Sequence, residues 1–288
     1  MENYTDFVKE LVRQFGEAEK LPLKTDESAR PSLPQAKSDS LKGKNFLIFA
    51  PHPDDECIMG LLPLRLMAEC GANIIDVAVT LGSKVERRAE RLEELKQACK
   101  YLGWGLRVCA GGGGLETVRL ASKNHDQPRW GKYVDEVAAI IKEFSPAAIF
   151  APHADDWNAT HIGTSYLVSD AAERAKYDGV VVNTEYWGGI REANLMVEAS
   201  EECVACQMQA LARHVKEVER NDYHLRMPAW MSDNVRRGTE LVGGQGAAAP
   251  KFHFATLYNV LERKGGVWRQ KFERKFLPLS EPADIILQ

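Results

Sequence analysis

The sequence predicts an α/β fold in which a mostly parallel sheet is covered by helices on both faces. From residue 44 onward, short apolar runs alternate with longer amphipathic stretches. Such alternation is typical of right-handed β-α-β crossovers, which place the strands in parallel. Polar, chemically active residues follow two of the apolar runs directly. Because ligands of such sheets bind outside the carboxyl ends of the strands, we expect a site at that edge.

The predicted elements follow one another in chain order. Residues 1 to about 20 have apolar side chains at helical spacing, and residues 21–41 are rich in proline, serine and charge. Strands are predicted at 45–49, 74–80, 106–109, 147–151 and 180–184, with a final strand at 252–261. Helices are predicted at 61–70, 87–102, 133–144, about 161–175 and 201–220, and loop composition at 239–250. We therefore divide the chain into a helical arm and linker, residues 1–41, and an α/β domain, residues 42–288.

The composition narrows the class of protein. The chain is 44% apolar and 27% charged, which suits a folded protein with a substantial core. A net charge of -4 gives no general reason to bind nucleic acid or an anionic membrane surface. We expect a cytoplasmic protein without a membrane span, because the sequence has neither a secretory signal nor a long apolar run. The six cysteines are then expected to be reduced thiols.

The first group of candidate residues directly follows the strand predicted at 45–49. His52 is followed by two adjacent carboxylates, Asp54 and Asp55. Ionised groups are rarely buried together unless they are paired or bind a metal. These residue types favour a divalent cation such as zinc, which needs at least one further protein ligand.

The second group follows the strand predicted at 147–151 and has the same design. His153 and a pair of aspartates come first, and His161 lies a few residues later. Two strand ends, each followed by His and Asp, indicate one shared site. From spacing alone, both His153 and His161 are candidates for the missing ligand.

Four ordered motifs resemble one known family. Residues 52–56, His-Pro-Asp-Asp-Glu, look like the opening signature of the PIG-L or LmbE-like zinc-dependent N-acetylglucosaminyl deacetylases. Residues 91–103 resemble the family's Arg-x-x-Glu helix, which ends in Leu-Gly. Residues 156–164 are similar to its Asp-x-His-Pro-Asp-His-x-Ala-Thr segment, and residues 210–214 to its Ala-Leu-x-x-His. The resemblance covers roughly residues 44–260 and implies a Rossmann-like three-layer sandwich with its metal site at the carboxyl ends of the strands.

The resemblance assigns a role to several residues. The ligands of Zn²⁺ map to His52, Asp55 and His161. Asp54 maps to the general base that takes a proton from zinc-bound water. Arg91 matches the family's substrate-binding arginine.

The chain departs from the family pattern at two positions. Asn158 stands where the family has the first His of His-Pro-Asp-His, and Thr160 replaces the Asp of that motif. An Asn amide can donate a hydrogen bond to an oxyanion, but it cannot carry a proton to the leaving amine. We therefore expect Asn158 to stabilise the oxyanion. The general acid and the partner of the metal-binding His stay open; the alternatives for the acid are protonated Asp54, His153, His214 and His253.

Together these features predict a zinc-dependent hydrolase. It would remove the N-acetyl group from a small N-acetylated sugar or glycoconjugate of the N-acetylglucosamine type. Two alternatives stay open: an amidase that acts on a thiol conjugate or another acylated amine, and a zinc- or sugar-binding protein whose catalysis has lapsed. The N-terminal arm and the glycine-rich loop at 239–250 make a homo-oligomer a reasonable expectation.

Overall fold

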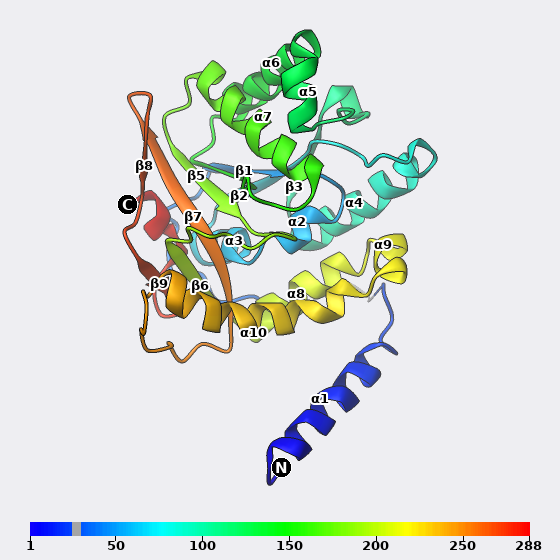
Figure 1. The fold of residues 1–288 in the computed structure, drawn as a ribbon, viewed down its shortest axis with the longest axis vertical. Helices are drawn as coiled ribbons and strands as arrows, with labels where there is room; N and C mark the ends of the chain where they lie inside the picture. Colours follow the sequence, from blue (N-terminus) through cyan, green and yellow to red (C-terminus); the bar gives the residue numbers. More distant parts are fainter. Residues whose placement is uncertain (25–29) are drawn as a thin grey trace.

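The computed structural model describes residues 1–24 and 30–288 and is built around one mixed sheet with helices on both faces (Figure 1). Its strand order is β3-β2-β1-β4-β5-β7-β6-β9, with β8 paired to β7. The predicted α/β class and mostly parallel sheet are confirmed. Residues 25–29, which belong to the predicted linker, lie outside the described residues. The division of the chain after residue 41 stays a prediction.

The parallel half of the sheet contains the strands that the sequence predicted. They are β1 (Asn45–Ala50), β2 (Asn73–Ala78), β3 (Gly105–Val108), β4 (Ala148–Pro152) and β5 (Val180–Thr184). All four pairings among them are parallel. From β1 the chain first adds β2 and β3 on one side, and then returns to add β4 and β5 on the other. The strand order therefore reverses between β1 and β4, and the crevice at such a switch point is where ligands of open α/β sheets bind.

The other half of the sheet differs from the prediction. It consists of β6 (Leu195–Ala199), β7 (Phe254–Lys264), β8 (Val267–Gln270) and β9 (Lys275–Leu277). The strand predicted at 252–261 is not the last, because a tight turn at Gly265 and Gly266 leads into β8, and the 3₁₀ helix η4 (Ala283–Leu287) comes after β9. Both glycines have positive φ, which two-residue hairpin turns require. Strands β6, β8 and β9 were not predicted from the sequence.

Each face of the sheet has its own layer of helices. The helices on one face are α5 (Leu120–His125), α6 (Gln127–Phe144) and α7 (Ala159–Ala175), and those on the other are α3 (Leu62–Cys70), α4 (Arg88–Leu102), α8 (Glu201–Leu211) and α10 (Tyr223–Leu241) (Figure 1). Successive residues of a strand point to opposite faces. Accordingly, Leu47 and Phe49 join the core under α6 and α7, whereas Phe46 and Ile48 join the core under α3 and α8. Both faces of β1 are therefore buried, which explains its continuous apolar run.

The helical part of the chain also required corrections. The helix predicted at 201–220 is two helices, since α8 ends at Leu211 and α9 (Val215–Arg220) begins after His214. Helix α10 was not predicted, and its interior contains Pro228, a residue that normally disfavours a helix. No helix in the described part of the chain combines the length and the hydrophobicity needed to cross a bilayer. All six cysteines are free and buried.

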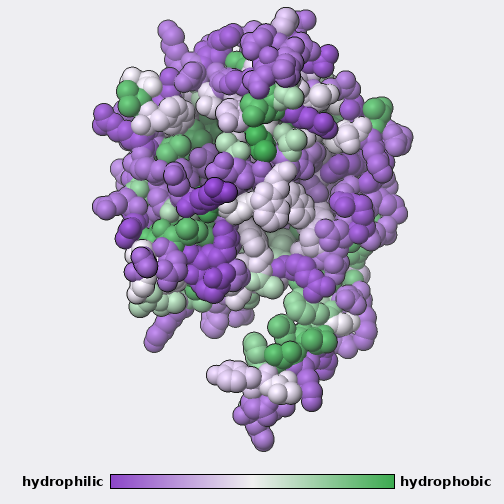
Figure 2. All heavy atoms as spheres, in the orientation of Figure 1, coloured by the Kyte–Doolittle hydropathy of each residue, from purple (hydrophilic) through white to green (hydrophobic). Residues whose placement is uncertain are grey.

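The N-terminal helix α1 (Tyr4–Ala18) projects from the body (Figure 1). None of its side chains is buried, and apolar side chains such as Phe7, Leu11 and Val12 gather on its surface (Figure 2). The predicted helix is thus present. The expectation of a homo-oligomer stays a prediction.

Candidate functional site

The ends of β1 and β4 bring the two strand-end motifs to one edge of the sheet. The two strands are parallel neighbours, with Phe46 opposite Ala148 and Ile48 opposite Phe150. After β1 the short helix α2 (Asp55–Ile58) starts almost at once. After β4 a loop leads to α7, which places His161 in the first turn of that helix.

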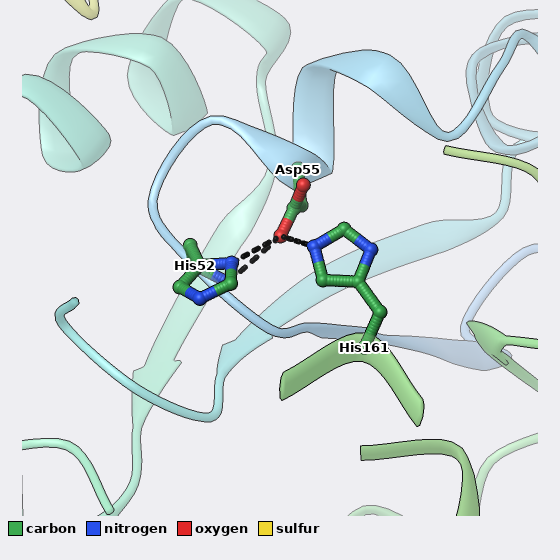
Figure 3. A group of neighbouring side chains, drawn as sticks. All are labelled: His52, Asp55 and His161. Atoms are coloured by element: carbon green, nitrogen blue, oxygen red, sulfur yellow. Dashed lines mark hydrogen bonds and ion pairs between the residues drawn. The ribbon is translucent and has the colours of Figure 1, made fainter. Parts of the chain in front are cut away.

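Three of the predicted residues converge at this edge (Figure 3). Asp55 Oδ2 lies 3.2 Å from His52 Nδ1 and 3.1 Å from His161 Nε2. Asp55 and His161 are buried, and His52 is partly exposed. One ligand atom from each residue lies within 4.8 Å of the other two, so the group could hold a metal ion. Two imidazoles and a carboxylate are one of the ligand sets that zinc uses when it keeps an open position.

The surroundings of His161 fit a bound cation. Both ring nitrogens are buried, and neither makes a hydrogen bond of good geometry with the described residues, although Nε2 lies close to Asp55. Burial opposes protonation of His161, but the carboxylates of Asp55 and Asp156 outweigh it and raise the pKa to about 10. For Asp55, burial alone would raise the pKa, yet His161 and His52 hold it well below its usual range. The site therefore stabilises positive charge at the point where these side chains meet, as a metal centre requires.

Asp156 supplies the carboxylate partner that the sequence left open. Its Oδ1 lies 3.5 Å from His161 Nδ1, on the far side of the ring from Asp55. Its Oδ2 accepts hydrogen bonds from the backbone N–H groups of Trp187 and Gly188, at 3.2 and 3.1 Å. A carboxylate in this position fixes the orientation of a metal-binding imidazole and increases its basicity. Asp156 matches the first Asp of the family segment, so its carboxylate is the one beside His161 although Thr160 stands in place of the segment's second Asp.

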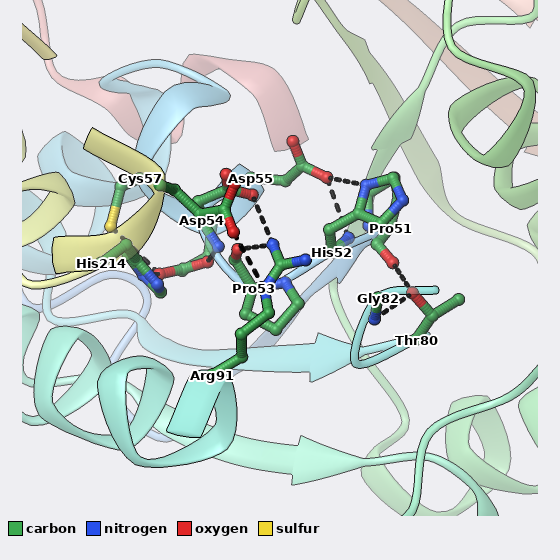
Figure 4. A network of polar contacts seen from close by, with 12 residues as sticks. Pro51, His52, Pro53, Asp54, Asp55, Cys57, Thr80, Gly82, Arg91 and His214 are labelled. Atoms are coloured by element: carbon green, nitrogen blue, oxygen red, sulfur yellow. Dashed lines mark hydrogen bonds and ion pairs between the residues drawn. The ribbon is translucent and has the colours of Figure 1, made fainter. Parts of the chain in front are cut away.

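The candidate base Asp54 lies beside the cluster in a strained backbone (Figure 4). Its φ of 123° is rare for a residue with a side chain, and such strain of about 1–3 kcal/mol persists only where the surroundings fix it. Its Oδ2 accepts a hydrogen bond from the Tyr223 hydroxyl at 2.6 Å, and Oδ1 lies 3.7 Å from Arg91 Nη2. Burial, followed by the neighbouring Asp55, raises the pKa of Asp54 to about 6. Tyr223 was not identified from the sequence, because no local pattern marks it.

His214 does not reach the cluster directly. It is fully buried, and its Nε2 lies 2.6 Å from Glu56 Oε1. The other carboxylate oxygen of Glu56 accepts a hydrogen bond from the Asp54 backbone N–H at 2.8 Å. Burial opposes protonation of His214, but Glu56 outweighs it and raises the pKa. Glu56 thus binds the strained backbone of Asp54, and His214 contacts Glu56 rather than the metal cluster. The role of His214 as a proton donor stays a prediction.

The remaining candidates have different surroundings. Asn158 caps α7, since its Oδ1 accepts a hydrogen bond from the Thr160 backbone N–H at 2.8 Å. Its amide nitrogen has no partner in the described parts of the chain and is free to donate. His153 is buried with Nε2 2.7 Å from Gly188 O, outside the group of potential ligands. His253 is exposed.

A cavity of about 460 Å³ opens beside the cluster. Its wall includes His52 and Thr80 from the ends of β1 and β2, the loop 115–119, and Asn158 and Thr160 from the start of α7. Asp54 is not part of this wall, and its carboxylate contacts Tyr223 and Arg91. The cavity therefore reaches the site from the side of His52 and Asn158.

Part of the chain matches a known protein family. Residues 47–172 match the family model described as PIG-L, GlcNAc-PI de-N-acetylase. The likeness to this family is therefore shown for this stretch, which is less than half of the chain. Both strand-end motifs, residues 52–56 and 156–164, lie within the matched stretch. A search of curated proteins found no significant match.

Solved structures share the fold at low sequence identity. The zinc-inhibited form of teicoplanin deacetylase Orf2 is 16% identical with a TM-score of 0.53, and the alignment covers 77% of this chain and 100% of that one. The N,N'-diacetylchitobiose deacetylase from Pyrococcus horikoshii is 14% identical with a TM-score of 0.53, with 91% and 94% covered. The 4-carboxy-2-hydroxymuconate hydratase GalB from Pseudomonas putida KT2440 is 16% identical with a TM-score of 0.53, with 77% and 97% covered. The fold around the matched stretch is therefore shared by deacetylases and by a hydratase.

Proposed function

We propose that the protein is a zinc-dependent hydrolase that removes the N-acetyl group from an N-acetylglucosamine-type sugar or glycoconjugate. The observation that carries the proposal is the convergence of His52, Asp55 and His161 next to Asp54 within the stretch that matches the PIG-L family model. Two of the similar structures are deacetylases, which supports the same reaction class. Because the same fold also includes a hydratase, the proposal rests on the site rather than on the fold.

The two aspartates next to each other have separate tasks in this proposal. Together with His52 and His161, Asp55 would hold the cation, and the Lewis-acid chemistry of zinc polarises a carbonyl and acidifies water. Asp54 would accept a proton at Oδ1, because Oδ2 already accepts the hydrogen bond from Tyr223. Its pKa of about 6 leaves it ionised at neutral pH and still basic enough to take a proton.

Asn158 and Arg91 would support the reaction without transferring protons. The Asn158 amide nitrogen is free to donate a hydrogen bond to a carbonyl oxygen that becomes negative during attack. Arg91 donates to Pro53 O at 2.7 Å and lies near both Asp54 and Glu217. These contacts favour a role of Arg91 in holding Asp54 in place, alongside the substrate binding that the family resemblance implies.

A second function is favoured by one observation. The Oδ1 of Asn158 is used to cap α7, and this asparagine stands where the family resemblance has a histidine. A protein that binds zinc and a sugar without turnover would have this arrangement. Zinc binding is common to both functions, so only turnover separates them.

The test measures release of free amine by the zinc-loaded protein. The panel contains N-acetylglucosamine, its β-linked dimer, N-acetylglucosaminyl-inositol and a simple acylated amine. We expect activity on a sugar, lost in Asp54→Asn while zinc remains bound. Activity only on the simple amine would favour the amidase. Absence of turnover at full zinc occupancy would contradict the deacetylase and favour the binding protein.

A further inference from the structure

The cavity beside the cluster has an excess of positive charge. Apart from His52, its charged lining residues are Arg88, Glu116 and Arg119. Arg88 Nη1 donates to Glu116 Oε1 at 2.8 Å, so these two charges compensate each other. Arg119 is exposed, and no hydrogen bond or ion pair joins its side chain to another residue in the described ranges. One guanidinium in the wall is therefore left without an anion.

The loop that carries Arg119 is held in a strained conformation. Thr117 has a φ of 54°, in the left-handed region, which is a genuine outlier for a β-branched residue. Its carbonyl accepts a hydrogen bond from the Ser122 hydroxyl, and the Tyr133 hydroxyl donates to Glu116 O at 3.0 Å. At the start of the loop, the Leu115 backbone N–H donates to Val79 O at 2.7 Å. Strained residues that are fixed in this way cluster at ligand clamps and active sites.

Helix α7 fixes the other side of the same loop. Gly163 lies one half-turn after His161, and a Cβ on it would come within 2.6 Å of Arg119 Cα. Only glycine allows the backbone of Val118 and Arg119 to lie so close to the helix. The position of Arg119 is thereby tied to the helix that carries His161.

We propose that Arg119 binds an oxyanion of the substrate, so that the cavity takes N-acetylated sugars that carry a carboxylate or phosphate group. This inference rests on the proposed function, because it names the class of substrate for the same site. A guanidinium presents a planar pair of donors that matches both oxyanions. Because Arg88 is already paired with Glu116, Arg119 is the arginine of the wall that is left to bind the negative charge of the substrate.

The first measurement compares substrates that differ only in charge. They are the methyl glycoside of N-acetylglucosamine, its carboxymethyl glycoside, and N-acetylglucosamine 1-phosphate. We expect kcat/KM for at least one anionic substrate to exceed that for the methyl glycoside about tenfold or more, the usual worth of a charged hydrogen bond. The excess is expected mainly in KM and to shrink as salt is added, because the contact is exposed. The carboxylate and phosphate arms identify which oxyanion is bound.

Three variants assign the preference to Arg119. Arg119→Gln removes the charge and is expected to bring the ratio of anionic to neutral kcat/KM close to one. Arg119→Lys keeps a charge without the planar fork and is expected to restore part of the ratio. Arg129→Gln is the matched control, because Arg129 is an exposed arginine of α6 outside the cavity and pairs with Asp126. A ratio that survives Arg119→Gln, or that is lost equally in Arg129→Gln, would refute the proposal.

A binding measurement separates this inference from the proposed function. Calorimetry of zinc-loaded protein with glucosamine 1-phosphate and with methyl glucosaminide requires no turnover. Preference for the phosphate that disappears in Arg119→Gln supports the oxyanion site even if no member of the panel is hydrolysed. Equal binding of the two sugars, together with equal turnover of charged and neutral substrates, overturns it even if deacetylation is established.

Discussion

The two strand ends at the site share the pattern His-x-Asp-Asp, but the side chains make different contacts. After β1 the chain reads His52-Pro-Asp-Asp55, and after β4 it reads His153-Ala-Asp-Asp156. The first histidine meets its aspartate in the candidate metal cluster, whereas His153 faces the carbonyl of Gly188. Asp156 lies beside His161, with Oδ1 3.5 Å from His161 Nδ1, outside the group of potential ligands.

The difference arises from the helix that comes after each strand. Helix α2 starts at Asp55 and turns its carboxylate back towards His52, whose backbone N–H donates to Asp55 Oδ2 at 2.9 Å. After β4 the chain runs through a loop before α7 begins at Ala159, so a later histidine, His161, arrives at the shared edge. Identical local patterns therefore acquire different roles through the next element, and each pair of matched residues offers a test.

The largest effect is expected for the histidines. His161→Ala should weaken zinc binding by more than about 100-fold, because even partners of metal ligands account for 10–100-fold. His153→Ala should retain zinc and lose only the stability of one hydrogen bond to Gly188, about 1 kcal/mol, plus any packing. Zinc content after dialysis and calorimetric titration measure both. Equal loss of zinc in the two variants would show that the third ligand has been assigned wrongly.

The next largest difference in activity is expected between variants of Asp54 and Asp155, the first aspartate of each pair. Asp54→Asn should lower kcat about 10²–10⁴-fold with zinc retained, since it removes the proposed base. Asp155→Asn, its exposed counterpart after β4, should change kcat by less than about twofold, as surface changes usually do. Steady-state kinetics of the zinc-loaded variants measure both changes in kcat. A residual activity in Asp54→Asn comparable to that of Asp155→Asn would remove Asp54 from the mechanism.

Asp156→Asn sharpens the comparison on the β4 side. We expect zinc affinity to fall about 10–100-fold, because a neutral amide does not increase the basicity of the His161 ring as a carboxylate does. Thr160→Ala, at the position where the family has its Asp, should leave zinc affinity unchanged. Competition with a chelator of known affinity measures both variants. If the threonine variant lost zinc and the Asp156 variant kept it, the assigned partner would be the wrong residue.

The smallest expected effect concerns His214. His214→Leu should lower stability by about 1–3 kcal/mol, because it removes the donor that faces the buried carboxylate of Glu56. If His214 only positions Asp54 through Glu56, kcat should fall by the same factor for acylated amines with good and with poor leaving groups. A proton donor would instead show a much greater loss with the poor leaving group. Urea unfolding and a leaving-group series separate the two roles.

The sequence by itself determined the class of fold and the position of the site. Continuous apolar runs alternating with helical periodicity indicate a parallel sheet, and His52, Asp54 and Asp55 lie next to one another after a strand. Contacts between such near neighbours depend on local geometry alone, which explains why His52 and Asp55 were found together.

The tertiary structure decided which distant groups complete the site. Tyr223 reaches Asp54 from 169 residues away, and His214 reaches Glu56 from 158 residues away. No local pattern marks Tyr223, and the motif that ends at His214 does not reveal that His214 meets Glu56, because both approaches depend on how α8 and α10 pack on the sheet. The same holds for Arg119, whose place in the cavity wall depends on its loop packing against Gly163 of α7. The sequence order alone brings His52, Asp54 and Asp55 together, whereas long-range packing brings Tyr223, His214 and Arg119 to the site.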